Sequence, residues 1–223
     1  MSGKVLVLYG SPKGERGASA NIAGHVIEGI RGGGADVSSL SIYRSLDQEE
    51  AFERLVKAYD EAESVVLAFP LYIDTLPAGV TEALARLLPR REGMTRRRRQ
   101  LLVICNCGFP ESQHCRYALR SCQLFAERMG MEFWGGVAIG QGGMLGGGNG
   151  EQARANRRQV EALRSMGSRL AGGKAIPAEA VELLARPAIP SRMYTLFGNM
   201  GWNKLARKNG VRGQMRARPY QRG

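Results

Sequence analysis

A buried strand, a polar loop and a helix start follow one another within Val5–Asn21, and this stretch constrains the chain more than any other. Val5–Tyr9 is an apolar run that ends at Gly10-Ser11-Pro12. After a loop with glycines, Ser19-Ala20-Asn21 opens a segment with apolar residues at helical spacing. The first N–H groups of a helix lack internal partners and carry partial positive charge, so this order indicates an anion site. The apolar residues at helical spacing are Ile22, Val26 and Ile30.

The loop after the first strand lacks the spacing of two common phosphate loops. No Gly-Lys-Ser/Thr closes it, and no G-x-G-x-x-G spacing follows Gly10. A short loop with several hydroxyls suits a terminal monophosphate such as that of FMN, with Ser11 and Ser19 as donors. The alternative is an ordinary turn between a strand and a helix, with a serine cap.

Apolar strands and amphipathic helices alternate along most of the chain. Continuous apolar runs predict buried strands, and apolar residues at helical spacing predict the helices that cover them. Five such units specify a parallel sheet covered on both faces, and they fit a flavodoxin-like three-layer α/β/α sandwich with strand order 2-1-3-4-5. The predicted strands are 5–9, 35–42, 64–69, 101–105 and 133–140, and the predicted helices are 18–30, 48–61, 77–88, 111–129 and 151–171.

This strand order brings together the carboxyl ends of strands one, three and four, so two further loops test the phosphate hypothesis. After strand three, residues 70–77 contain Tyr72, which offers a stacking face, between two prolines that stiffen the backbone. After strand four, Asn106 offers hydrogen bonds, Gly108 allows close approach and Phe109 can cap a ring. Together the three loops predict a site for a flat aromatic ring with a phosphate at one end.

These loops resemble those of the flavodoxin-like NAD(P)H-dependent FMN reductases and quinone reductases. The resemblance rests on Gly-Ser-Pro-Lys at 10–13, on Ser19-Ala20-Asn21 and on the two later loops, and it covers roughly residues 4–171. It implies FMN as cofactor, NAD(P)H as electron donor, a small-molecule acceptor and a homodimer or homotetramer. The residues that it assigns to FMN are Ser11, Lys13, Ser19, Ala20, Asn21, Pro70, Leu71, Tyr72, Ile73, Asp74, Asn106, Cys107, Gly108 and Phe109.

The implied reaction is an FMN-dependent transfer of hydride from NAD(P)H to a flavin, a quinone or a similar acceptor. Because the flavin carries this chemistry, we expect no catalytic side chain. Of the two histidines, His25 lies in the first helix, and we expect a surface or helix-terminal role for His114. Two alternatives stay open: a flavodoxin-type electron carrier, and a basic interaction module that has kept the fold without the cofactor. Carriers of that type are usually acidic, whereas this chain has a net charge of +12.

All four cysteines fall within one short region, at Cys105, Cys107, Cys115 and Cys122. Their spacing is neither that of a zinc finger nor Cys-x-x-Cys. Cys105 ends a predicted buried strand and Cys122 lies on the apolar face of a predicted helix, so packing is favoured over an iron–sulfur cluster. We therefore expect no metal site.

The positive charge belongs to two local features. One is the expected exposed basic connection 90–100 with Arg86 before it, and the other is the tail, which has no acidic residue after Glu182. We expect residues 1–172 to form the FMN-binding domain and 173–223 a basic helical extension that packs on it or on a partner subunit. A basic amphipathic segment also suits peripheral contact with an anionic membrane. Because the charge is local, we do not expect a nucleic-acid partner.

The 223 residues contain no run of the ~18–20 apolar residues that a membrane span needs. The chain begins with Met-Ser-Gly-Lys and runs directly into a strand, without the apolar core of a signal peptide. We therefore expect a cytoplasmic protein.

Overall fold

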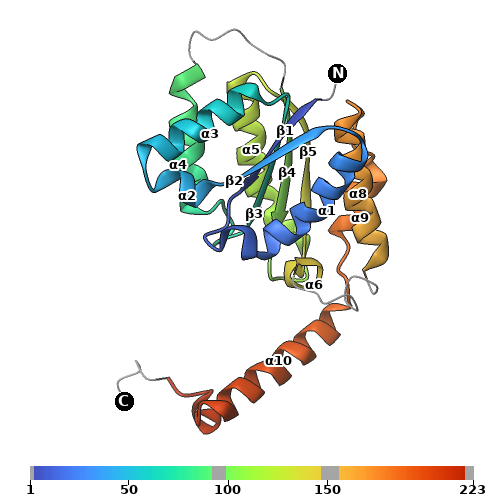
Figure 1. The fold of residues 1–223 in the computed structure, drawn as a ribbon. Coiled ribbons are helices and arrows are strands. Elements are labelled where there is room, and N and C mark those ends of the chain that lie inside the picture. The colour runs from blue at the N-terminus through green and yellow to red at the C-terminus, as the bar shows by residue number, and fades with distance from the viewer. Residues whose placement is uncertain (1–2, 92–98, 147–155, 219–223) are drawn as a thin grey trace. The chain divides into compact units, whose positions relative to one another are not determined.

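The computed structural model describes residues 3–91, 99–146 and 156–218, and the chain forms two compact units that divide between Ala188 and Ile189. The first unit contains a parallel sheet with strand order β2-β1-β3-β4-β5, which confirms the predicted order (Figure 1). The strands are β1 (Lys4–Tyr9), β2 (Asp36–Ser41), β3 (Ser64–Pro70), β4 (Gln100–Asn106) and β5 (Glu132–Ile139).

Helices cover both faces of the sheet, so the first unit is the predicted three-layer sandwich (Figure 1). One face carries α3 (Glu49–Glu61), α4 (Ala78–Leu87) and α5 (Arg116–Met129), and the other carries α1 (Ala18–Gly32), α8 (Arg157–Ala171) and α9 (Ala178–Ala185). The short elements are α2 (Ile42–Leu46), α6 (Gly142–Gly146) and the 3-10 turns η1 (Gly14–Arg16), η2 (Pro89–Arg91) and η3 (Ser112–Cys115). The second unit contains α10 (Ser191–Lys208) and η4 (Arg212–Gln214).

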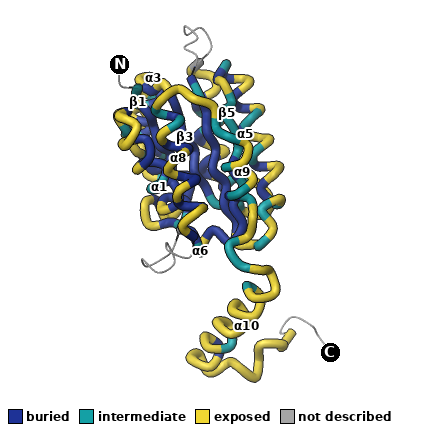
Figure 2. The backbone as a smooth tube through the Cα atoms, turned by 90° about the vertical axis from the view of Figure 1, so that its right-hand side faces the viewer, coloured by how far each residue is buried: buried dark blue, intermediate teal, exposed yellow. Residues whose placement is uncertain are grey.

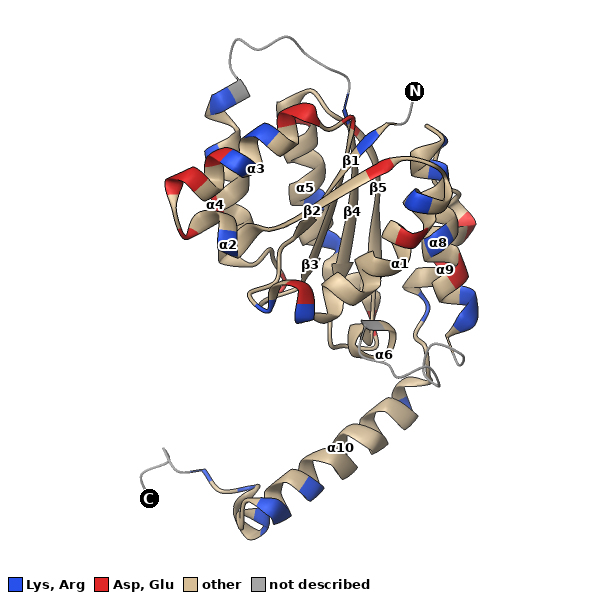
Figure 3. Ribbon diagram, viewed as in Figure 1, with Lys and Arg blue, Asp and Glu red and all other residues tan. Residues whose placement is uncertain are grey.

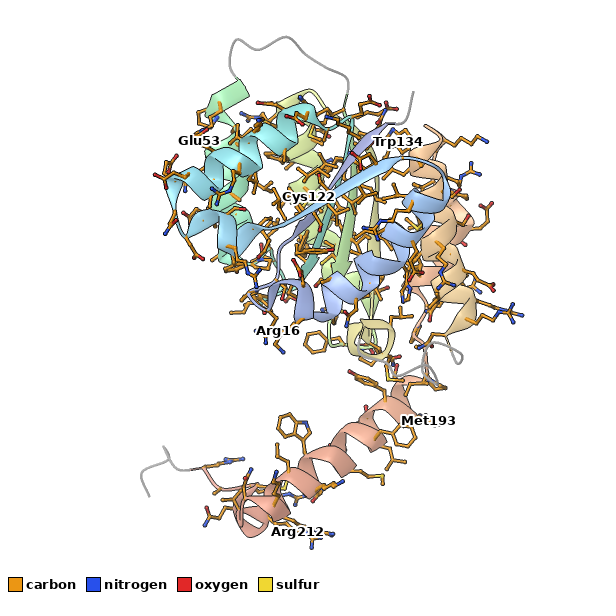
Figure 4. The ribbon with its side chains drawn as sticks, in the orientation of Figure 1. Arg16, Glu53, Cys122, Trp134, Met193 and Arg212 are labelled. Carbon is orange, nitrogen blue, oxygen red and sulfur yellow. The ribbon has the colours of Figure 1, made fainter. Side chains whose placement is uncertain are left out.

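The central strands are buried on both faces, which explains their continuous apolar sequences (Figure 2). Successive side chains of a strand point to opposite faces. In β3, for example, Val65, Leu67 and Phe69 pack with α3, α4 and α5, whereas Val66 and Ala68 pack with α1 and α8. Cys122 of α5 lies in the first of these two layers (Figure 4).

Two predicted boundaries differ from the structure because of short local elements. The predicted second strand included Ile42, which instead begins α2; the Ser41 hydroxyl accepts from the Arg44 N–H at 3.5 Å as its cap. The glycine-rich segment 141–150, between the fifth predicted strand and the fifth predicted helix, contains α6, and its residues 147–150 lie outside the described part of the chain. The predicted fifth helix begins at Arg157, after residues 151–155 that are also not described.

Arg99 corrects the prediction that residues 90–100 form an exposed connection. Its side chain is only 3 % exposed. The guanidinium donates from Nε to the Ala62 carbonyl at 3.0 Å and from Nη2 to the Asp60 carbonyl at 2.8 Å, and the Asp60 carboxylate lies 3.6 Å away. Arginine is buried here because its planar donors meet the last carbonyls of α3. Residues 92–98 of this connection are not described.

The first compact unit extends beyond the expected domain boundary at residue 172. Pro177 precedes α9, and the Leu184 side chain of that helix is fully buried in the layer that α1 and α8 form. The Ser112 hydroxyl also donates to the Ala185 carbonyl at 2.8 Å. Residues 173–188 therefore belong to the sandwich, and the basic extension begins at Ile189.

Helices α1 and α8 cross at two glycines. A Cβ added at Gly29 would lie 1.9 Å from the Arg164 carbonyl oxygen, and one added at Gly167 would lie 2.0 Å from the Val26 carbonyl oxygen. No real Cβ approaches an oxygen so closely, so either addition forces the helix backbones apart. This close crossing joins the first helix of the chain to the last long helix of the sandwich.

The crossing predicts opposite outcomes for two alanine substitutions in α1. Gly29→Ala forces α1 away from α8 and lowers the free energy of unfolding by about 1–3 kcal/mol. Gly24→Ala is the matched control, because a Cβ there meets no atom within 4 Å, and it raises stability by about 0.5–1 kcal/mol. Urea unfolding followed by circular dichroism measures both. Equal stability of the two variants would contradict the crossing.

Candidate functional site

Three loops that follow β1, β3 and β4 meet at the carboxyl edge of the sheet, where the sequence predicts a cofactor site. They comprise residues 10–17, 71–77 and 107–111. The strands before them are neighbours, since β3 lies between β1 and β4. The topology thus places the loops together whatever their separation in the sequence.

The Asn106 side chain connects these loops. The Ser19 hydroxyl at the start of α1 donates to Asn106 Oδ1 at 2.7 Å, and both residues are buried. The Leu71 N–H, which begins the loop after β3, donates to the Asn106 carbonyl at 2.7 Å. A Cβ added at Gly142 would lie 2.5 Å from Asn106 Nδ2, so the segment after β5 also packs on this side chain. The side chain and the backbone carbonyl of Asn106 together thus contact the segments that follow β1, β3 and β5.

The loop after β1 curls tightly before α1. Gly14 has φ +55°, a left-handed conformation that favours glycine. The Lys13 N–H donates to Ser11 Oγ at 3.2 Å. Gly17 is the N-cap of α1 and offers no side-chain cap to the helix, and its carbonyl accepts from Ala20 and Asn21. The start of α1 is therefore positively polarised and available to an anion.

The loop after β3 presents exposed residues on a tight turn. Tyr72 and Thr75 each donate their N–H to the other's carbonyl at 3.1 Å, and the two residues between them have left-handed backbones, Ile73 with φ 49° and Asp74 with φ 56°. This conformation is costly for a β-branched residue, and the Ile73 side chain is nonetheless 97 % exposed. Strain of this kind is concentrated at functional sites, which makes this turn a candidate for ligand or partner contact.

The loop after β4 is anchored from β5 and leaves an aromatic ring exposed. Its N–H and carbonyl groups pair with the end of β5: Cys107 donates to the Ile139 carbonyl at 2.9 Å, and the Gln141 N–H donates to the Phe109 carbonyl at 2.7 Å. The Phe109 ring is 55 % exposed and packs on the His114 ring at 4.7 Å between centroids. His114 Nδ1 lies 3.5 Å from Asp74 Oδ1, so this rim joins the loops after β3 and β4.

The predicted FMN residues fall into a buried and an exposed group. The side chains of Ser11, Ser19 and Asn106, which the sequence assigned to the ligand, make hydrogen bonds within the protein in this structure. The other buried residues are Ala20 and Cys107, and Pro70 and Leu71 are half-buried. The exposed residues are Lys13, Asn21, Tyr72, Ile73, Asp74, Gly108 and Phe109.

Sequence reasoning missed Gln141 and Gly142 as parts of this edge. Gln141 is fully buried and has φ 53°, and the Gly142 N–H donates to the Cys107 carbonyl at 2.9 Å. The available signal was Gly140, which directly follows β5 and where an added Cβ would lie 2.3 Å from the Pro110 carbonyl oxygen, since a glycine at such a place marks close backbone approach. The glycine-rich context after β5 concealed that signal.

The cysteines pack in the core near this edge, and among the described residues no cluster of potential ligands could hold a metal ion. The Cys115 thiol donates to the Cys105 carbonyl at 3.6 Å. Hydrogen bonding with Cys105 is the main cause that raises the pKa of Cys115 to about 12, and burial raises the pKa of Cys122 to about 12. The pKa of Cys107 is also raised, chiefly by hydrogen bonding with Cys115.

These pKa shifts predict inert thiols. Because alkylation requires the thiolate, iodoacetamide at neutral pH labels Cys107, Cys115 and Cys122 in the folded protein far more slowly than in urea. Above pH 9.0, the ordinary thiol pKa, the unfolded chain loses its thiol protons while the folded protein still keeps them. The free energy of unfolding therefore falls as the pH rises above that value. Mass spectrometry of labelled peptides and urea unfolding against pH check the two results. Rapid native labelling would contradict the packing.

The Ser19–Asn106 bond predicts a coupled pair. Ser19→Ala leaves the Asn106 Oδ1 buried without this donor and costs about 1–3 kcal/mol of stability. Adding Asn106→Leu to that variant costs less than the two single losses together, since both polar partners are then absent. Ser121→Ala is the control, because that hydroxyl is exposed and bonds only within its own helix. Additive losses in urea unfolding would refute the coupling.

Comparisons with known proteins agree with this architecture. A family model described as "Flavodoxin-like fold" (Flavodoxin_2) matches residues 3–164. A search of curated proteins finds no match. Among solved structures, an NAD(P)H:quinone oxidoreductase from Methanothermobacter marburgensis is 18% identical, with 76% of this chain and 96% of that chain covered and a TM-score of 0.57.

Two further solved structures have the same fold. An FMN-dependent NADH-azoreductase from Bacillus anthracis, solved in complex with FMN, is 13% identical over 75% of this chain and 99% of its own, with a TM-score of 0.56. A flavodoxin from Streptococcus pneumonia is 15% identical over 76% and 99%, with a TM-score of 0.53. At these identities the likeness concerns the fold alone. By its sandwich, its strand order and the match over residues 3–164, the chain belongs to the flavodoxin-like family Flavodoxin_2.

Proposed function

We propose that the protein is an FMN-dependent oxidoreductase that transfers hydride from NAD(P)H to a flavin, a quinone or a similar small acceptor. The observation that carries this proposal is the meeting, at one sheet edge, of a helix start without a side-chain cap and two exposed aromatic rings. The first suits a phosphate and the second suits a flat ring system. Both belong to loops that the strand order brings together.

The phosphate end of FMN fits the loop after β1. The start of α1 supplies partial positive charge, and the cap residue Gly17 has no side chain to cover it. The Lys13 side chain is exposed beside this loop and adds a full positive charge. Ser11 and Ser19 lie underneath, where their hydrogen bonds hold the loop in shape, so we assign them a supporting role in addition to contact with the phosphate.

The ring of FMN fits between the other two loops. Tyr72 and Phe109 are 43 % and 55 % exposed and are available for stacking. At Gly108 a Cβ would meet no atom within 4 Å, so the backbone there is open to a ligand. The tight Ile73–Asp74 turn and the bonds from β5 hold both loops in place before any ligand binds, which lowers the entropic cost of binding.

Bound FMN supplies the hydride chemistry, and the chain's own groups supply orientation and electrostatics. Backbone N–H groups of the loops after β3 and β4 would stabilise negative charge that develops on the ring. The His114 imidazole lies between Phe109 and Asp74 and so orients these two side chains at the rim. This assignment requires no side-chain nucleophile, which agrees with the burial of the four cysteines.

Two of the solved structures with the same fold support the proposal, since one is a quinone oxidoreductase and the other an FMN-dependent azoreductase. A flavodoxin is also among the neighbours, so an electron carrier is the second candidate. The charge of this chain favours the enzyme, because carriers of that type are usually acidic and this chain carries +12. We also propose a homodimer or homotetramer, which light scattering of the purified protein measures.

Cofactor and donor titrations test the function. We expect the purified protein to bind FMN, to oxidise NADH or NADPH and to reduce an added quinone in repeated turnover. Tyr72→Ala and Phe109→Ala each remove a stacking face, worth about 0.5–1.5 kcal/mol, and so weaken FMN binding by roughly threefold to tenfold. Tyr117→Ala is the control, because that ring is 61% exposed but belongs to α5 and to none of the three loops.

The alternatives give different results in the same assays. FMN binding without steady-state oxidation of either nicotinamide identifies an electron carrier. Failure to bind FMN refutes the oxidoreductase and leaves an interaction module. Equal losses in the Tyr117 control and the two loop variants would show that the aromatic residues do not form the ring site.

A further inference from the structure

The second unit exposes an unusual set of apolar side chains. Residues 189–218 leave large hydrophobic groups in solvent along α10 and after it (Figure 2). Exposed apolar surface on this scale marks a surface that contacts a partner. The exposed side chains are Met193, Leu196, Phe197, Met200, Trp202, Leu205, Val211 and Met215.

Every charged residue of this unit is basic (Figure 3). The eight Lys and Arg residues after Ile189 account for eight of the twelve net positive charges, so the first unit is left at about +4. An anionic partner would therefore complement this unit, whereas a second copy of the chain carries a net positive charge itself. The basic residues are Arg192, Lys204, Arg207, Lys208, Arg212, Arg216, Arg218 and Arg222.

One stripe of α10 changes from apolar to basic along the helix, although Arg192 lies in the first turn and Trp202 and Leu205 lie in the second half. Met193, Leu196, Phe197 and Met200 follow the i, i+3, i+4, i+7 spacing that forms one stripe on a helix. Lys204 and Arg207 continue the same stripe one and two turns later. One line along α10 thus changes from apolar to cationic between its first and second half.

The chain after α10 returns to the cationic end of the helix. The Val211 N–H donates to the Ala206 carbonyl at 2.9 Å and the Gly210 N–H to the Arg207 carbonyl at 3.1 Å, while Gly210 has φ 69°. This is the hydrogen bonding of a helix that ends in a reversal of the chain. Met193 and Arg212 consequently lie at opposite ends of the unit (Figure 4).

We propose that the second unit is a docking surface for an anionic lipid bilayer. In a bilayer, phosphate groups lie outside the acyl chains, so an oblique helix can insert its apolar half while its cationic half meets the phosphates. The helix has 18 residues, about 27 Å in length, and among the described residues no helix is long and apolar enough to cross a bilayer. The contact is therefore with the membrane surface.

The aliphatic side chains favour lipid over nucleic acid. Nucleic acids are bound by basic residues and stacking aromatic rings. Aliphatic side chains do not strengthen binding to phosphates or bases, but they pack favourably against acyl chains. This unit exposes Leu196, Leu205, Val211 and several methionines. Trp202 with its amphipathic ring suits the boundary between the two regions of a bilayer.

Vesicle co-sedimentation of the full-length protein tests the proposal. We expect binding to phosphatidylcholine vesicles that contain phosphatidylglycerol, and little binding to phosphatidylcholine alone. Raising the salt from about 0.1 M to about 1 M weakens the binding, since it shortens the screening length from about 10 Å to 3 Å. A single-tryptophan variant, Trp134→Phe, reports the insertion of Trp202 through a blue shift of its fluorescence on anionic vesicles.

Two sets of substitutions separate the contributions. Neutralising Lys204, Arg207, Lys208 and Arg212 to glutamine weakens binding on the order of 10²-fold or more, because each cation near an anionic surface strengthens it roughly fivefold. Leu196→Ser with Phe197→Ser removes the blue shift at Trp202. The matched control neutralises four exposed cations of the first unit that have the same total charge, namely Arg31, Lys57, Arg158 and Lys174.

The results divide clearly. Equal binding to neutral and anionic vesicles, or an equal loss in the control, overturns the proposal. The wild-type protein could instead be a dimer that does not bind vesicles, while the Leu196→Ser, Phe197→Ser variant is a monomer. In that case the surface contacts a second copy of the chain and the proposal fails. Preferential binding of duplex DNA or RNA over anionic vesicles also overturns it. Circular dichroism of each variant confirms that the sandwich is folded.

Discussion

The Asn106 amide lies where the segments after β1, β3, β4 and β5 meet, and the arrangement of the candidate site depends on it. Its side-chain oxygen accepts from Ser19, Gly142 packs against its Nδ2, and the backbone carbonyl of the same residue accepts from Leu71. A buried amide of this kind is stable only when its partners are present, so it specifies one relative position of the four segments. The parallel sheet brings the strand ends together, and this side chain determines their alignment.

Ser11, Ser19 and Asn106 are buried in hydrogen bonds, so the exposed part of the site consists of the Tyr72 and Phe109 rings, the backbone at Gly108 and the side chains of Lys13, Asn21, Ile73 and Asp74. A flat anionic ligand requires this division between buried, hydrogen-bonded residues and exposed residues. Stacking needs exposed ring faces, and the residues beneath them must keep a fixed position. The strained Ile73 turn belongs to the rim and is held by the Tyr72–Thr75 bridge. The second unit carries a different kind of surface, in which charge and apolar area change along a single helix.

The sequence predicted the sheet well because strands buried on both faces, such as β3 and β4, are continuous apolar runs between loop residues. It failed where a tertiary partner decides the outcome. Arg99 is buried because carbonyls at the end of α3 lie beside it, and α9 belongs to the sandwich because Leu184 finds an apolar layer. The loops of the candidate site were predicted in the right place, but the direction of the Ser19 hydroxyl was not, because its acceptor lies far away in the sequence.

The crossing of α1 and α8 at Gly29 and Gly167 has a consequence for biosynthesis. These are the first helix and the last long helix of the sandwich along the chain, and their backbones touch without intervening side chains. The amino-terminal helix therefore cannot reach its final position until residues near 170 have left the ribosome. During most of translation the side of α1 that faces α8 stays uncovered, so the nascent chain depends on late completion, and on chaperones if elongation pauses before that point.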